Sequence, residues 1–157
     1  MTRFVRTAIL LTALSLTGTL SAQSDISLVS AKAKANAEAY MAIAAKCLKY
    51  PKDDPAAFGG VCRGALNDLQ NYYMSEQGRP VSQYDRNFAY YFQGFLNQQV
   101  AFAYSMSDGY VGSAACQWLS EAKRSFNQID PNGWPAANQN SIPGVQASMD
   151  KVLTKCR

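Results

Sequence analysis

The chain has 157 residues, with 15 Lys and Arg, 11 Asp and Glu, and no histidine. The absence of histidine excludes Ser-His-Asp and Cys-His nucleophiles, histidine general bases and histidine-bound metals. The basic residues are spread over every segment and form no stripe, so nucleic acid is not expected as a partner.

The first 22 residues have the pattern of a secretory signal peptide. Arg3 and Arg6 give a basic start, an apolar run follows from Ala8 to Leu16, and cleavage is expected after Ala22 or Ser21. The apolar run is too short to anchor the chain in a membrane. We expect an exported protein without a membrane span in its mature form, residues 23–157, located in the periplasm or outside the cell. Its 135 residues are enough for a single domain.

Five segments of the mature chain carry apolar residues at steps of three and four, which predicts an all-α domain. The segments run from Asp25 to Tyr50, Pro55 to Gly78, Ser82 to Ser107, Tyr110 to Ile129 and Pro143 to Cys156. Proline and glycine residues separate the segments, and a long polar loop from Asp130 to Ser141 precedes the last one. We expect about five helices in an antiparallel bundle or in stacked helical hairpins.

The segment from Ser82 to Ser107 holds half of the chain's Phe and Tyr residues. It has no charge from Asn87 onward and carries two apolar seams, so little of its surface is expected to face water. Several amides interrupt its middle, which favours the central helix of a bundle over a membrane span. Ser82 and Asp85 have the spacing of a capping box at its start.

The four cysteines are expected to form two disulfides, because the chain is predicted to be exported. Residues at equal distances from the turn of a helical hairpin lie opposite each other. Cys47 and Cys62 are centred on the turn near Asp54, and Cys116 and Cys156 are centred on the long loop. The sequence therefore predicts the pairs Cys47–Cys62 and Cys116–Cys156.

Two small-residue patterns favour close packing between helices. The first predicted helix is rich in alanine, which suits contact with the aromatic helix, although the same surface could dock a partner. Gly59, Gly60 and Gly64 lie in the second predicted helix and indicate a close helix crossing, with a ligand against the backbone as the alternative.

The acidic residues show no catalytic arrangement. Those outside predicted turns and caps are Glu38, Asp68, Glu76, Glu121 and Asp150, and none forms a recognisable pair. The cysteines are too far apart for redox or zinc motifs. We therefore expect a protein that is not an enzyme and that needs no metal or other cofactor.

Aromatic residues near the predicted helix ends are the main candidates for contact with a partner. They are Tyr72, Tyr73, Tyr84, Tyr110 and Trp134. Trp and Tyr dominate binding hot spots, although Trp134 could instead close the open end of the bundle. The leading hypothesis is a non-enzymatic protein that binds another envelope or secreted protein.

The alternative hypothesis is a small-molecule-binding bundle with its ligand beside the aromatic central helix, 82–107. The candidate pocket residues are Phe95, Gln98, Gln99 and Phe102, which would offer stacking surfaces and a few polar contacts. A solvent-filled cavity beside this helix would favour the ligand hypothesis, and a close-packed core would exclude it.

Overall fold

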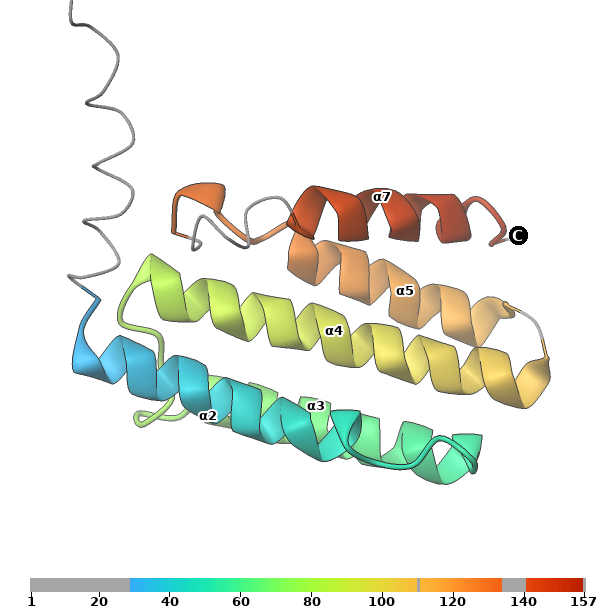
Figure 1. Ribbon diagram of the computed structural model, residues 1–157, viewed down its shortest axis with the longest axis horizontal. Helices are drawn as coiled ribbons and strands as arrows, with labels where there is room; N and C mark the ends of the chain where they lie inside the picture. Colours follow the sequence, from blue (N-terminus) through green and yellow to red (C-terminus); the bar gives the residue numbers. More distant parts are fainter. Residues whose placement is uncertain (1–28, 110, 134–140, 157) are drawn as a thin grey trace, which may run out of the picture.

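The computed structural model describes residues 29–109, 111–133 and 141–156, which form an antiparallel all-α bundle without strands (Figure 1). The elements are α2 (Ala31–Leu48), α3 (Pro55–Met74), α4 (Gln83–Asp108), α5 (Ser113–Phe126), a short 3-10 helix η1 (Pro131–Gly133) and α7 (Ser141–Leu153). The predicted fold class is confirmed. None of these described helices is both long and apolar enough to cross a membrane.

Helix α4 lies in the middle of the bundle, between the α2–α3 pair and the helices α5 and α7 (Figure 1). One of its two apolar seams is buried at Ala89, Phe92, Leu96, Val100 and Ala103. The other seam is only partly covered, and the Phe102 side chain at its end is 45% exposed. The central position was predicted correctly. The expectation that little of α4 faces water holds over most of the helix, and its large exposed hydrophobic side chains are Phe102 and Met106.

The ends of α4 are set by local sequence. The Ser82 hydroxyl accepts a hydrogen bond from the backbone N–H of Asp85, and the Asp85 carboxylate accepts one from the backbone N–H of Ser82 at 2.9 Å. This reciprocal arrangement is the predicted capping box. Gly109 ends the helix with a φ of 70°, a left-handed conformation that glycine adopts without steric penalty.

Helices α2 and α3 form the first stapled hairpin. The Ser30 side chain caps α2, and Asp54 caps α3 by accepting a hydrogen bond from Ala57 N–H at 3.0 Å. The predicted disulfide Cys47–Cys62 joins the two helices next to their turn, with the Cα atoms 4.5 Å apart. Residues 25–28, where the first helix was predicted to begin, lie outside the described residues.

Helices α5 and α7 form the second stapled hairpin. The predicted disulfide Cys116–Cys156 joins α5 to the segment just after α7, with the Cα atoms 5.8 Å apart. Helix α5 is shorter than predicted, and α7 begins at Ser141 rather than Pro143. A proline is tolerated in the first turn of a helix because the N–H groups of that turn make no intrahelical hydrogen bond, so the N–H that proline lacks is not needed.

The segment after α5 is fastened to α4 by one buried side chain. The Asn87 amide donates to the Asp130 carbonyl at 2.7 Å, and its oxygen accepts from the Asp130 N–H at 3.0 Å. Gln83 also donates to the Asn87 oxygen at 2.8 Å. These bonds fix the direction in which the chain leaves α5.

Glycine allows close helix contact at fewer positions than the sequence indicated. A Cβ at Gly59 would lie 3.0 Å from the Cβ of Ala103 on α4, so the predicted close crossing occurs there. A Cβ at Gly60 or Gly64 would meet no atom within 4 Å, so these two glycines do not contribute to it. The tighter contact is at Gly94 of α4, where a Cβ would lie 2.9 Å from the ring of Phe126 on α5.

Candidate binding groove

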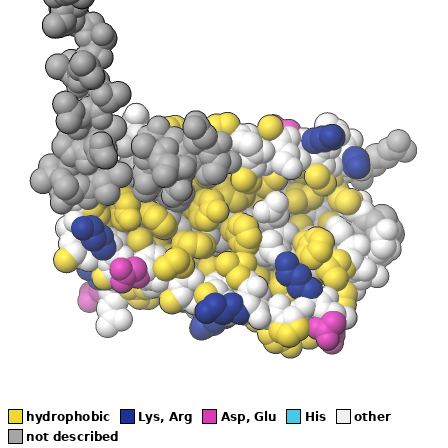
Figure 2. All heavy atoms as spheres, viewed as in Figure 1, with side chains coloured by type: hydrophobic (Ala, Val, Ile, Leu, Met, Phe, Trp, Pro, Cys, Tyr) yellow, Lys and Arg dark blue, Asp and Glu magenta, His cyan; other side chains and the backbone are white. Residues whose placement is uncertain are grey.

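An open groove of about 540 Å³ runs along the partly covered side of α4, and we call it the α4 groove. Hydrophobic side chains spread across the middle of the face shown in Figure 2, over α4. The groove is lined from α4 by Phe95, Gln98, Gln99, Ala101, Phe102 and Ser105, and from elsewhere by Lys52, Val111, Leu119 and Val152. Its walls therefore come from α4, α5, α7 and the turns that precede α3 and α5.

The structure brings the four predicted pocket residues, Phe95, Gln98, Gln99 and Phe102, to this one groove. They lie at steps of three and four along α4, so they share one helix face. The ring of Phe95 stacks on that of Tyr91, with the ring centroids 6.3 Å apart. The rings of Phe95 and Phe102 and the amides of Gln98 and Gln99 can therefore contact the same bound molecule. That these residues bind a ligand remains a prediction.

Sequence reasoning missed Lys52, which belongs to the turn between α2 and α3 and reaches the α4 groove. Its ammonium nitrogen lies 5.3 Å from the centroid of the Phe102 ring and 5.4 Å from that of Phe58. Both distances are within the range of a cation–π interaction. No local pattern identifies this contact, because it depends on how the first hairpin packs against α4.

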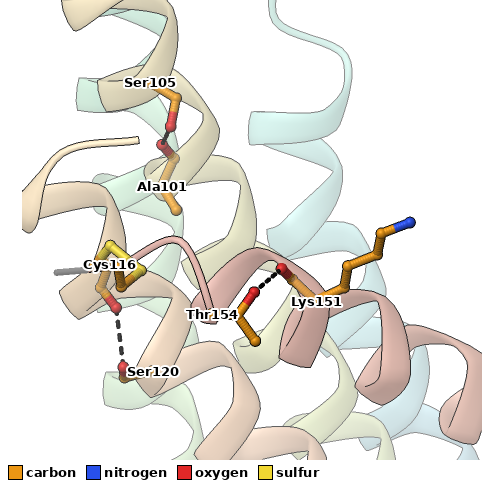
Figure 3. The surroundings of a disulfide bond; sticks show 7 residues. Ala101, Ser105, Cys116, Ser120, Lys151 and Thr154 are labelled. Atoms are coloured by element: carbon orange, nitrogen blue, oxygen red, sulfur yellow. Dashed lines mark hydrogen bonds between the residues drawn. A yellow bond between two sulfur atoms is a disulfide. The ribbon is translucent and has the colours of Figure 1, made fainter. Parts of the chain in front are cut away.

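One end of the α4 groove lies beside the second disulfide, where α4, α5 and α7 come together (Figure 3). Three hydroxyls near this disulfide donate to nearby backbone carbonyls: Ser105 to Ala101 O at 3.1 Å, Ser120 to Cys116 O at 3.0 Å and Thr154 to Lys151 O at 2.8 Å. Of these three residues, Ser105 is the one that lines the groove. The Lys151 side chain points away from the disulfide. This end of the groove is therefore less polar than its sequence indicates.

Three of the predicted partner-contact tyrosines are described by the structure; they do not line the α4 groove, and they pack against other rings. Tyr72 and Tyr73 are half-buried, and their ring centroids lie 5.6 and 6.5 Å from that of Tyr40. Tyr84 is also half-buried, with its ring 4.9 Å from that of Phe88. Tyr110 and Trp134 lie outside the described residues. The structure does not bring the three described tyrosines together as one exposed surface.

Burial raises the pKa of several tyrosine hydroxyls. The pKa of Tyr40 is well above its usual range because the side chain is buried and the Asp85 charge lies nearby. Burial also raises the pKa of Tyr73, with a further contribution from its hydrogen bond to Tyr90. The pKa of Tyr84 is also raised, first by burial and then by the nearby charge of Glu38. A raised pKa keeps these phenols neutral, so none is prepared to act as a base near pH 7.

A buried polar cluster near the start of α4 was only partly predicted. Asp85 accepts hydrogen bonds from the Asn36 amide at 2.8 Å, from Val81 N–H at 3.0 Å and from both the N–H and the hydroxyl of Ser82. Burial alone would raise the pKa of Asp85, but these hydrogen bonds outweigh it and hold the pKa below its ordinary value. The carboxylate is thus a structural acceptor. Asn36 was missed because it lies in an alanine-rich segment that carries no signal for a buried amide.

The five acidic residues that the sequence placed outside turns and caps lie at the surface of the described part of the chain. Glu38, Asp68, Glu76, Glu121 and Asp150 are all exposed, and three of them form ion pairs with Lys46, Arg124 and Lys123. Within the described ranges, no group of His, Cys, Asp and Glu side chains could hold a metal ion. The α4 groove itself contains no carboxylate among its lining residues.

No known family model, curated protein or solved structure matches this chain. The geometry of the α4 groove is therefore the basis for a functional proposal.

Proposed function

We propose that this protein is an exported, non-enzymatic binding protein whose α4 groove holds a small, largely apolar molecule. The observation that carries the proposal is the groove itself, a space of about 540 Å³ beside the aromatic helix. Ligand sites in proteins are typically concave, mostly apolar, a few hundred Å³ in size and supplied with a few polar groups. The α4 groove fits this description, with Gln98 and Gln99 as polar groups.

Binding rather than catalysis is supported by the chemistry of the groove. It offers aromatic and aliphatic surface, two amides, a hydroxyl already donated to a carbonyl and one ammonium. An acid–base pair or an activated nucleophile would need a group with a suitably shifted pKa at this place. Export is supported by the basic and apolar start of the chain and is compatible with its two disulfides.

The test uses a neutral apolar dye, Nile Red, with residues 23–157 in the oxidised state. We expect its fluorescence to rise on binding, and Phe102→Ala to weaken the binding by about tenfold because an aromatic wall is lost. Phe102 is 45% exposed, so this change is expected to leave the fold intact. Met74→Ala is the matched control, since Met74 is 72% exposed and lies outside the groove. Equal dye binding by both variants would contradict the proposal.

Native mass spectrometry of the same protein, purified gently from its own cell envelope, gives a second test. A bound small mass that is retained by Met74→Ala and lost by Phe102→Ala would support a ligand in the α4 groove. A spectrum that contains only the bare chain would count against a tightly held ligand.

Binding to another envelope or secreted protein is a second candidate function. It is favoured by exposed apolar side chains at the connection between α3 and α4, where Met74 is 72% and Val81 is 56% exposed. Large apolar side chains this exposed are candidates for contact with a partner protein. In a pull-down, this candidate predicts a protein that is lost with Met74→Ser/Val81→Ser and retained with Phe102→Ala. The ligand proposal predicts no such pattern.

A further inference from the structure

The α4 groove has one charged side chain among its lining residues, the ammonium group of Lys52. This group lies over the rings of Phe102 and Phe58, at 5.3 and 5.4 Å from their centroids. These two aromatic contacts, one with α3 and one with α4, hold the Lys52 side chain against the bundle rather than leaving it to point freely into water. The cation therefore has a defined place at the edge of an apolar space.

The Lys52 charge is not neutralised by a salt bridge with another described residue. The ion pairs in the described part of the chain are Lys46–Asp68, Lys123–Asp150 and Arg124–Glu121. Lys52 is followed directly by two acids, Asp53 and Asp54, of which Asp54 is already engaged in capping α3. A cation that makes no salt bridge to a described residue and lies at an apolar edge is complementary to an anion.

The rest of the α4 groove complements an apolar chain. Phe95, Ala101, Leu119 and Val152 supply aromatic and aliphatic surface from three helices. The Ser105 hydroxyl is already used by a helix carbonyl. A molecule bound in the groove would therefore contact apolar side chains along its length and a positive charge at one edge.

We propose that the α4 groove binds an amphipathic anion, with a hydrocarbon or aromatic body along α4 and a carboxylate beside Lys52. This inference rests on the proposed small-molecule function and adds the chemical class of the ligand. An anionic headgroup gains the attraction of Lys52, whereas a neutral one does not and a cationic one is repelled. The apolar body supplies most of the binding because burial of hydrocarbon surface is the larger effect.

The experiment compares three probes with the same eight-carbon chain, each kept monomeric in solution: octanoate, 1-octanol and octyltrimethylammonium. Binding to oxidised residues 23–157 is measured by isothermal titration calorimetry at pH 7 and low salt. Octanoate is expected to bind about fivefold more tightly than octanol, which is the size of one exposed ion pair. The advantage should shrink in 0.5 M NaCl because salt screens exposed charges.

Lys52→Gln is expected to remove the preference for octanoate over octanol. Lys49→Gln is the matched control, because it removes the same charge from a neighbouring exposed residue that does not line the groove. Equal affinity of all three probes, or the same loss with both variants, would overturn the inference and leave the proposed function standing. If none of the probes binds the wild-type chain, the proposed function falls together with the inference.

Discussion

The Asn36 side chain on α2 donates a hydrogen bond of 2.8 Å to the Asp85 carboxylate on α4, and both residues are fully buried. The same Asn36 amide also donates to the Arg79 carbonyl at 3.1 Å. One amide thus ties α2 to the turn before α4 and to the capping box of α4. Among the buried side-chain polar atoms of the described residues, only the Asn36 oxygen lacks a hydrogen-bond partner.

Replacement of Asp85 by Ala is expected to be strongly destabilising. The change removes the acceptor for Asn36, Val81 and Ser82 and leaves their donors unsatisfied in a buried place. Hydrogen bonds to a charged group contribute about 1.5–3 kcal/mol, and unsatisfied buried donors cost a similar amount. The free energy of unfolding should therefore fall by at least about 2 kcal/mol, as measured by urea denaturation followed by circular dichroism.

Glu38→Ala is the control for the Asp85 variant, because Glu38 is an exposed acid on α2. Surface substitutions of this kind usually change stability by no more than about 0.5 kcal/mol. If the two variants unfold at the same urea concentration, the buried cluster does not stabilise the fold as described.

The lowered pKa of Asp85 predicts that the protein loses stability in acid. Because the folded pKa lies below the unfolded one, the contribution of the carboxylate is fully present above the unfolded pKa, about 3.9. It is lost as the pH falls below that value and through the folded pKa. Urea midpoints measured from pH 6 to pH 2 should decline more steeply for the wild-type chain than for Asp85→Asn, which has no proton to gain. If the urea midpoints of the two proteins decline in parallel, the loss of stability in acid comes from groups other than Asp85.

A pair of glycine variants tests the contact between α4 and α5. Gly94→Ala places a Cβ 2.9 Å from the ring of Phe126, which is buried and has little room to move. Overpacking of this kind typically costs about 1–3 kcal/mol. Gly64→Ala is the matched control, since its Cβ meets no atom within 4 Å and alanine favours a helix by about 0.5–1 kcal/mol over glycine. We expect thermal denaturation to show a lower Tm for Gly94→Ala and a higher one for Gly64→Ala. Two changes of the same sign would refute this assignment.

Features set by local sequence or by distance along the chain were predicted correctly, whereas the contacts of Lys52 and Asn36 with α4 were not. The capping box at Ser82 needs only neighbouring residues, and the disulfides follow from the symmetry of a helical hairpin about its turn. The four groove residues share a face of one helix, so periodicity alone groups them. Lys52 and Asn36 could not be identified, because their roles depend on which part of α4 the first hairpin contacts.

The two disulfides should differ in how readily a reductant reaches them. Cys47 and Cys62 are both fully buried, whereas Cys116 and Cys156 are half-buried. Thiol–disulfide exchange requires direct access of the attacking thiolate to a sulfur atom. With limiting dithiothreitol and rapid alkylation, mass spectrometry should find label on Cys116 and Cys156 before Cys47 and Cys62. Simultaneous labelling of all four would show that the whole bundle opens before either disulfide is reduced.

Removal of the second disulfide should also affect the α4 groove. Cys116 and Cys156 are separated by 40 residues, and a loop of that length gives a stabilisation of about 4 kcal/mol in the chain-entropy description. Cys116→Ser/Cys156→Ser should therefore lower the urea midpoint. It should also weaken Nile Red binding, because α7 supplies the groove residue Val152 and loses its covalent link to α5. Dye binding that stays unchanged while α7 exchanges its amide hydrogens faster would show that the α7 wall is not part of the site.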